Sequence, residues 1–269
     1  MRIADLEQQT PLEKLETRIL LMHVSGLSRI QLITRSEEEL SPEQLVQFED
    51  LVTRRQHGEP IAYLTGEREF FGLPFYTTPS VLIPRPDTEL LVELALQHAP
   101  YGSHLLDMGT GSGAIAIAIA HNRPDLTVTA VDISADALVI AKKNAARLLT
   151  PDRITFRQSD WYQALQGQVF STIVSNPPYI VKDDPHLQEG DLRFEPINAL
   201  TDHADGLSAY RHIISHATNY LMPEGWLLLE HGYHQAQEVR ALLSSANFQY
   251  VQSWCDLAGI ERVSGAQRQ

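Results

Sequence analysis

A short polar and aromatic turn near the middle of the chain carries residues that could do chemistry on a nitrogen atom. The turn consists of Asn176, Pro177, Pro178 and Tyr179 and directly follows an apolar stretch. The Asn176 side-chain oxygen and the Pro177 carbonyl can each accept one hydrogen from an NH₂ group, while the prolines keep the turn rigid. Two such acceptors favour the pyramidal nitrogen of a transition state over the planar ground state. Tyr179 offers a flat surface for a planar amide or base, or it simply anchors the loop.

A second candidate site is a glycine-rich turn between an expected strand and an expected helix. Its residues are Gly109, Thr110, Gly111, Ser112 and Gly113. Glycine permits positive φ angles and the close backbone approach that a ligand over a helix N-terminus requires. Asp132 ends the next expected strand, about 19 residues beyond the turn, where a carboxylate can accept hydrogen bonds from both ribose hydroxyls. The two features together predict a site for an adenosine-like group.

The glycine turn by itself leaves the cofactor open. Gly109, Gly111 and Ala114 also match the dinucleotide fingerprint with its permitted alanine, so a nicotinamide-dependent dehydrogenase is one alternative. Asp107 favours S-adenosylmethionine, because a carboxylate suits a methionine ammonium and would lie badly near a pyrophosphate. A solvated strand end is an equally good interpretation of Asp107, and a non-catalytic binding module of the same fold is a further alternative.

Strands and helices alternate along the chain from the end of a helix expected over 88–98. This alternation predicts an α/β fold with a mostly parallel sheet covered by helices on both faces. Ligands gather at the carboxyl ends of parallel strands, so both turns should face one crevice. The expected strands are 105–106, 126–131, 154–156, 169–174, 226–229, 248–251 and 260–263, and the other expected helices are 114–120, 135–148, 207–221 and 235–243.

The first 60 residues are expected to form short helices. Thr10 and Ser41 are each followed by a proline and, three residues on, by Glu13 or Gln44. A hydroxyl at the N-cap, proline at the first helical position and Glu or Gln at the third are typical of a helix start. From Ala62 the apolar period changes toward two, which indicates a β-hairpin linker. The expected domains are therefore 1–60, a hairpin linker over 61–86, and 87–269.

Composition disfavours several classes of partner. The chain holds 34 Asp and Glu against 21 Lys and Arg, and the net charge of −13 would repel a phosphate backbone.

No apolar stretch approaches the ~20 residues of a membrane span, and the single cysteine, Cys255, cannot form an internal disulfide. Cytoplasmic location is expected, and no heptad repeat argues against a monomer. The pairs His212/His216 and His231/His234 lack the further ligands of a metal site, so no metal is expected.

Further motifs resemble a known family. The Asn-Pro-Pro-Tyr turn alone is shared with amino-group methyltransferases acting on DNA adenine, RNA guanine or protein glutamine. The wider set resembles the release factor glutamine methyltransferases, the HemK-like or PrmC group. The segments that carry this resemblance are 58–66, 70–72, 81–89, 194–196, 205–207 and 230–232.

The resemblance implies a class I, S-adenosylmethionine-dependent methyltransferase domain with a Rossmann-like, mostly parallel seven-stranded sheet, preceded by a helical domain that docks the protein substrate. It implies methyl transfer to the side-chain amide nitrogen of the glutamine in the Gly-Gly-Gln motif of peptide chain release factors, with S-adenosylhomocysteine as product. Residues 109–113, Asp132, Trp161 and Asn176 would bind the cofactor, and residues 176–179 the glutamine. Asp87 stands where many members carry Glu, so its role stays open.

Overall fold

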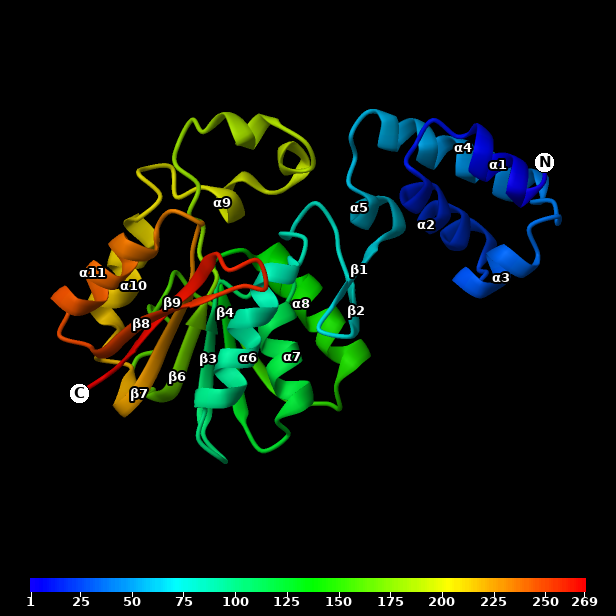
Figure 1. The fold of residues 1–269 in the computed structure, drawn as a ribbon. Coiled ribbons are helices and arrows are strands. Elements are labelled where there is room, and N and C mark those ends of the chain that lie inside the picture. The colour runs from blue at the N-terminus through cyan, green and yellow to red at the C-terminus, as the bar shows by residue number, and fades with distance from the viewer. The chain divides into compact units, whose positions relative to one another are not determined.

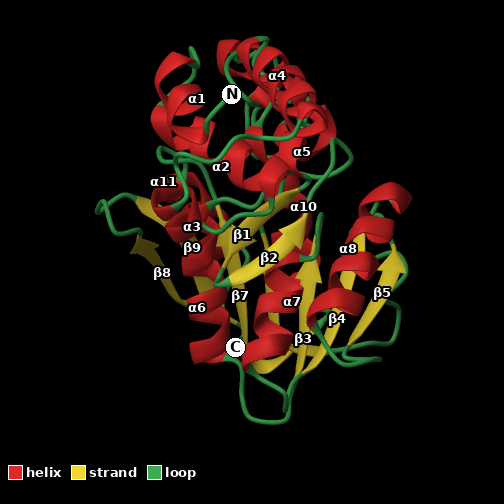
Figure 2. Cartoon of the chain, turned by 90° about the vertical axis from the view of Figure 1, so that its right-hand side faces the viewer, coloured by secondary structure: helices red, strands yellow, loops and turns green.

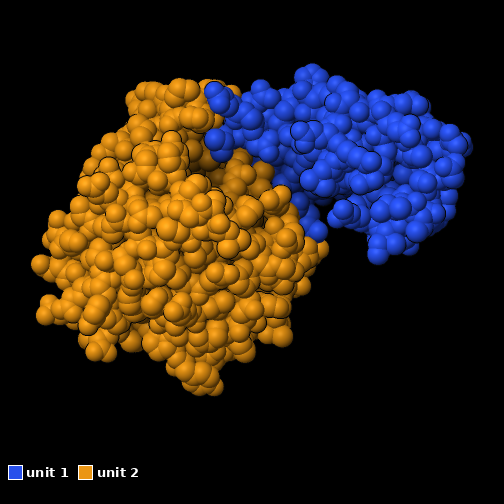
Figure 3. Space-filling model, viewed as in Figure 1, with its two compact units in different colours: residues 1–67, 189–194 blue, residues 68–188, 195–269 orange.

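The computed structural model describes all residues, 1–269, and the chain divides into two compact units (Figure 3). One unit consists of residues 1–67 and 189–194, and the other of residues 68–188 and 195–269. The three-part division expected from the sequence stays a prediction. No helix in the chain is both long and apolar enough to cross a bilayer.

The first unit is a small helical bundle. Its helices are α1 (Ile3–Gln9), α2 (Lys14–Ser25), α3 (Arg29–Thr34), α4 (Pro42–Gln56) and α5 (Ile61–Thr65) (Figure 1). They share a core that includes Ile3, Leu20, Leu21, Leu32 and Phe48. The late segment 189–194 belongs to this unit because Arg55 Nη1 bonds Asp191 Oδ1 at 2.9 Å and Arg193 Nη2 donates to the His57 carbonyl at 2.7 Å.

One of the two expected helix starts is confirmed and one is wrong. Ser41 caps α4 through a reciprocal box with Gln44, and proline occupies the first turn. Thr10 instead ends α1, where its hydroxyl donates to the Leu6 carbonyl at 2.6 Å, and α2 begins only at Lys14. The region around Ala62 is also helical, since α5 precedes the hairpin that was expected to start there.

A two-stranded hairpin follows, made of β1 (Glu67–Phe70) and β2 (Leu73–Tyr76). Phe71 and Gly72 turn the chain with positive φ angles of 52° and 76°. Phe70 and Phe75 meet edge to face with ring centroids 6.0 Å apart, and both are buried.

The second unit is built on a seven-stranded sheet, as predicted (Figure 2). The strand order is β5-β4-β3-β6-β7-β9-β8, and β9 alone runs antiparallel to the other six strands. The strands are β3 (His104–Met108), β4 (Thr127–Asp132), β5 (Ile154–Gln158), β6 (Phe170–Ser175), β7 (Leu221–Glu230), β8 (Gln249–Cys255) and β9 (Glu261–Gln267). The order reverses between β3 and β6, the position where open α/β sheets bind ligands.

Helices cover both faces of this sheet, because the central strands are apolar on both sides. Leu105 contacts the core under α6 and α7, whereas Leu106 contacts the core under α10 and α11. The helices are α6 (Glu89–His98), α7 (Ala114–Asn122), α8 (Ala135–Leu148), α9 (Ile197–Leu200), α10 (Ser208–Ala217) and α11 (Ala236–Ser245), with short 3₁₀ turns η1 (Pro86–Thr88), η2 (Pro185–Gln188) and η3 (Leu192–Phe194).

The register of the four central strands aligns their carboxyl ends. Met108 pairs with Val131 on one side and with Ser175 on the other, and Ser175 pairs with Leu229. The four residues that directly follow Val131, Met108, Ser175 and Leu229 therefore lie side by side in one row at the carboxyl ends of the strands. Those residues are Asp132, Gly109, Asn176 and Glu230.

Asn144 connects the hairpin to the glycine turn. It is fully buried in α8. Its Oδ1 accepts from the Tyr76 amide at 2.8 Å, and its Nδ2 donates to the carbonyls of Tyr76 and Ser112 at 3.0 and 2.9 Å. One side chain thus satisfies three backbone groups and fixes the position of the turn after β3.

We predict that Asn144→Ala lowers the free energy of unfolding of the second unit by about 2–4 kcal/mol, because the backbone groups of Tyr76 and Ser112 lose their partner at ~1–3 kcal/mol each. All three tryptophans lie in that unit, so urea unfolding followed by tryptophan fluorescence measures it. Asn122→Ala, which removes one bond to the Ala118 carbonyl at an exposed helix end, is the matched control. Equal losses in the two variants would contradict the role of Asn144.

Candidate active site

The glycine turn after β3 is held against the end of β4 by backbone hydrogen bonds. The amides of Gly109 and Thr110 both donate to the Val131 carbonyl at 2.9 Å. The Gly111 amide donates to Asp132 Oδ2 at 2.8 Å, and Asp132 Oδ1 accepts from the Ser134 amide at 2.9 Å. The structure therefore places the predicted turn and the predicted carboxylate in direct contact.

The three glycines of the turn serve different purposes. Gly109 and Gly111 have φ angles of 73° and 54°, and a Cβ at either position would meet no atom within 4 Å. Both therefore leave open space above the turn, as a site for a closely approaching ligand requires. A Cβ on Gly113 would lie 2.9 Å from Ile117 Cδ1 and 3.2 Å from Ala141 Cβ, so this glycine lets α7 pack against α8.

Asp107 lies beneath the turn and is completely buried. Its Oδ2 accepts from the Thr110 hydroxyl at 2.6 Å and from the Ala116 amide at 3.2 Å, while its Oδ1 is buried without a hydrogen-bond partner in the protein. Burial raises the pKa of Asp107 to about 7, although these two hydrogen bonds oppose the shift. The alternative that Asp107 is a solvated strand end is wrong, since no part of the residue reaches water.

Asp132 is half-buried beside the turn, and burial raises the pKa of its carboxyl while the amides of Ser134 and Gly111 favour the charged form. Each of its oxygens accepts one backbone amide, which leaves a further lone pair on each for another donor. The geometry suits a vicinal diol, as the sequence predicts.

Asn176 begins the second turn and is half-buried. Its Nδ2 donates to Glu230 Oε1 at 2.9 Å and lies 3.3 Å from the Thr88 hydroxyl oxygen. The amide nitrogen therefore faces the protein. Oδ1 is the atom that remains to accept a hydrogen bond from the NH₂ group of a bound molecule. The Ser175 hydroxyl donates to the Met108 carbonyl at 2.7 Å and ties this turn to the glycine turn.

The rest of the turn is fixed by Gln235, a residue that the sequence analysis missed. Gln235 Nε2 donates to the carbonyls of Tyr179 and Gly206 at 3.1 Å each, and its Oε1 accepts from the Gly232 amide at 3.0 Å. Pro177 is buried, and Tyr179 is half-buried with a phenol whose pKa is raised, mainly by burial. Pro178 is half-buried between them.

Trp161 lies just beyond the end of β5, at the same edge of the sheet, because Gln158 pairs with Asp132 and the Ser159 amide donates to the Asp132 carbonyl at 2.9 Å. Its backbone has a positive φ of 49°, and its ring centroid lies 6.1 Å from that of His212. No hydrogen bond or ring contact joins Trp161 to the glycine turn, so its role in binding stays a prediction.

Asp87 pairs with Arg262 Nη2 at 3.2 Å, and Arg262 Nε also donates to Asp256 Oδ2 at 3.1 Å. This ion pair links the turn before α6 to β9, within one residue of Thr88. The carboxylate whose role the sequence left open therefore has a partner in the fold.

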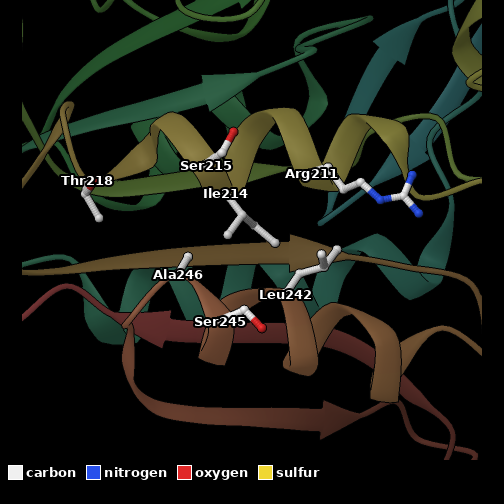
Figure 4. A pocket seen from close by; sticks show the side chains of 7 residues that line it. All are labelled: Arg211, Ile214, Ser215, Thr218, Leu242, Ser245 and Ala246. Carbon is white, nitrogen blue, oxygen red and sulfur yellow. The ribbon is translucent and has the colours of Figure 1, made fainter.

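The structure contains no group of three or more His, Cys, Asp or Glu side chains that could hold a metal ion. A surface pocket of about 430 Å³ lies between α10 and α11 (Figure 4). None of its lining residues belongs to the two turns. The lining residues are Arg211, Ile214, Ser215, Thr218, Leu242, Ser245 and Ala246.

Known proteins resemble this chain over nearly its full length. Residues 3–66 match the family model of the PrmC N-terminal domain, and residues 85–189 match that of the methyltransferase small domain. The release factor glutamine methyltransferase of Burkholderia pseudomallei is 54% identical over 269 residues, which cover 97% of this chain and 94% of the relative. That of Escherichia coli is 48% identical over 93% of this chain and 90% of the relative.

This chain belongs to the release factor glutamine methyltransferase family. A methyltransferase from Pyrococcus furiosus shares the fold, with a TM-score of 0.58, 16% identity and coverage of 82% of this chain and 98% of that one. The class I methyltransferase fold is thus confirmed for this family member. Membership also decides the cofactor in favour of S-adenosylmethionine over a nicotinamide dinucleotide.

We predict that Asp107→Asn removes a decline in stability between pH 4 and pH 7. Because the pKa of Asp107 is raised in the fold, the unfolded chain loses this proton first as pH rises, so the free energy of unfolding falls across this range and is level above it. The free energy of unfolding of the variant minus that of the parent should therefore rise by up to about 4 kcal/mol from pH 4 to pH 8.

Urea unfolding at a series of pH values measures this difference. Asp125→Asn is a control of opposite sign, because the hydrogen bonds from Arg123 lower the pKa of Asp125 and its stabilisation is lost as pH falls. A difference between Asp107→Asn and the parent that does not change with pH would contradict the assignment.

Proposed function

We propose that this protein transfers the methyl group of S-adenosylmethionine to the side-chain amide nitrogen (N5) of the glutamine in the Gly-Gly-Gln motif of peptide chain release factors, leaving S-adenosylhomocysteine. The observation that carries the proposal is the Asn176 turn: the Asn176 amide nitrogen donates a hydrogen bond to Glu230, and the turn lies beside the glycine turn. Family membership supports the choice of acceptor, since relatives at 54% and 48% identity carry that activity in their names.

The residues around the glycine turn fit the cofactor. Gly109 and Gly111 leave room above the turn, and Thr110 and Ser112 are buried and shape it from below. Asp132 has lone pairs for the ribose hydroxyls, and Trp161 would lie against the adenine. The bound cofactor supplies an electrophilic methyl group on a sulfonium. Buried Asp107 adds negative charge below the turn when it is ionised.

Asn176 and Pro177 would compensate for the weak nucleophilicity of an amide nitrogen. That nitrogen's lone pair is delocalised into the carbonyl, so it attacks poorly in its planar form. Asn176 Oδ1 and the Pro177 carbonyl would accept its two hydrogens, which favours a pyramidal nitrogen and fixes its direction. Pro178 and Tyr179 would enclose the glutamine side chain and exclude water from it.

A nucleic-acid base is the alternative acceptor, since it also presents a planar NH₂ group. The net charge of −13 opposes it. The first 60 residues hold seven Lys and Arg, and five of these cations are paired with carboxylates: Arg2, Arg18, Arg35, Arg54 and Arg55. A protein partner suits this surface better, and we place the enzyme in the cytoplasm as a monomer.

Mass spectrometry of a purified release factor incubated with the enzyme and S-adenosylmethionine tests the function directly. We expect one added methyl group on the glutamine of the Gly-Gly-Gln motif and none after that glutamine is replaced. Comparable labelling of protein-free DNA or RNA would instead support the alternative acceptor.

We predict that Asn176→Asp loses most methyl transfer while the cofactor Kd stays within about tenfold, because the change lies at the acceptor nitrogen and a carboxylate also attracts the sulfonium in the ground state. Rates with saturating release factor and calorimetry with the cofactor measure the two effects. Asn219→Asp introduces the same charge at an exposed position and should act like the parent. Equal turnover in Asn176→Asp and the parent would remove Asn176 from catalysis.

We predict that Asp132→Ala weakens cofactor binding by roughly 1–3 kcal/mol through the loss of charge-assisted hydrogen bonds. The change also frees the Gly111 amide, so the turn loses a contact at the same time. Calorimetry measures the affinity, with Asp136→Ala at an exposed position of the next helix as control. An unchanged Kd would place the ribose contact elsewhere.

A further inference from the structure

Glu230 ends β7 as a nearly fully buried carboxylate, with 3% of the residue exposed. Its Oε1 accepts the hydrogen bond from Asn176 Nδ2 at 2.9 Å, and its Oε2 is buried without a hydrogen bond. A carboxylate in such a place is costly, because burial disfavours the charged form. The packing of β7 alone does not call for a charge there, since the residues before it, Leu227, Leu228 and Leu229, are apolar and completely buried.

An ionised carboxylate has acceptors and no donor. The end of the Asn176 side chain that faces Glu230 must therefore be the NH₂ group, and Oδ1 must point the other way. A neutral amide or hydroxyl in place of Glu230 could donate as well as accept, and would tolerate Asn176 in either of its two orientations. The flipped orientation would present an NH₂ group to the acceptor nitrogen, where an oxygen is needed.

We propose that Glu230 is a positioning residue, whose carboxylate holds the Asn176 amide in the one orientation that can accept a hydrogen from the substrate nitrogen. This inference rests on the proposed function and names a further residue of the same site. Thr88 assists, because its hydroxyl oxygen lies 3.3 Å from the same Asn176 nitrogen.

The surroundings of Glu230 decide its charge. Burial raises the pKa of Glu230 to about 7, with a smaller rise from the Asp87 carboxylate, while Thr88, Arg262 and Asn176 favour the ionised form. The phenols of Tyr179 and Tyr210 also face it, and the pKa of each is raised. Protonated Glu230 could donate to Asn176 Oδ1 and release the amide orientation, so the rate should fall as pH falls below this range.

Two substitutions of Glu230 separate positioning from packing. Glu230→Gln keeps the shape and one acceptor but permits both Asn176 orientations, so kcat should fall about 2- to 10-fold. Glu230→Leu fills the space without a hydrogen-bond acceptor, and its kcat should fall about 10- to 100-fold. The Kd for S-adenosylmethionine should stay within about twofold in both variants, since neither touches the glycine turn.

The decisive test is a double-mutant cycle with Asn176→Ala, measured with tritiated methyl groups and a release factor as substrate. If Glu230 acts through Asn176, adding Glu230→Leu to the Asn176→Ala variant should lower kcat by less than about twofold. A full and independent loss in that background would overturn the inference. Asp125→Asn, which lies just before β4 at the amino ends of the parallel strands, shows what a destabilised fold with an intact site does, and its kcat should match that of the parent.

The pH profile gives a second readout that a packing role would not change. The parent should lose kcat between pH 8 and pH 5, and this acidic limb should be smaller in Glu230→Gln, where only Asp107 is left as a buried carboxyl with a pKa of about 7, whereas Asp87→Asn should keep the full limb. An acidic limb of undiminished size in Glu230→Gln would contradict the inference. An inactive parent would overturn the proposed function and this inference together, whereas an active parent with unaffected Glu230 variants would overturn this inference alone.

Discussion

The hydrogen bond between Asn176 and Glu230 depends on the register of the central sheet, and the rest of the site depends on the same register. Because Val131, Met108, Ser175 and Leu229 lie side by side on β4, β3, β6 and β7, the residues that follow them form one polar row. A slip of any strand would turn its end residue away from that row and its core residues toward the wrong face.

Two carboxyl groups, one in this row and one beneath the glycine turn, are unfavourable to bury. Asp107 and Glu230 both have a pKa near 7 because the fold removes their carboxyls from water. The large apolar cores on the two faces of the sheet stabilise a structure that contains these costly groups. Their placement is therefore best explained by the site: one lies under the cofactor turn, and the other orients the amide that meets the acceptor.

The sequence predicted the features that depend on neighbouring residues. It did not reveal the hydrogen bonds between residues that are far apart in the chain. The glycine turn, the Asn176 turn and the alternating strands follow from local residue types. Glu230 lies 54 residues from Asn176, and Asn144 lies 68 residues from Tyr76, so only the fold reveals those pairs. The five- to seven-residue helices α1, α3 and α5 are too short for a clear helical period, and Thr10 matched a start signal while it actually ends α1.

The orientation of the Asn176 amide is the central claim, and nuclear magnetic resonance of ¹⁵N-labelled asparagine side chains measures it most directly. The Asn176 signals are assigned by their loss in Asn176→Asp. We expect two distinct, slowly exchanging NH₂ protons whose shifts change as pH falls from 8 to 5 in the parent and stay constant in Glu230→Gln. Signals typical of a freely rotating, exposed asparagine, unaffected by Glu230→Gln, would contradict the account.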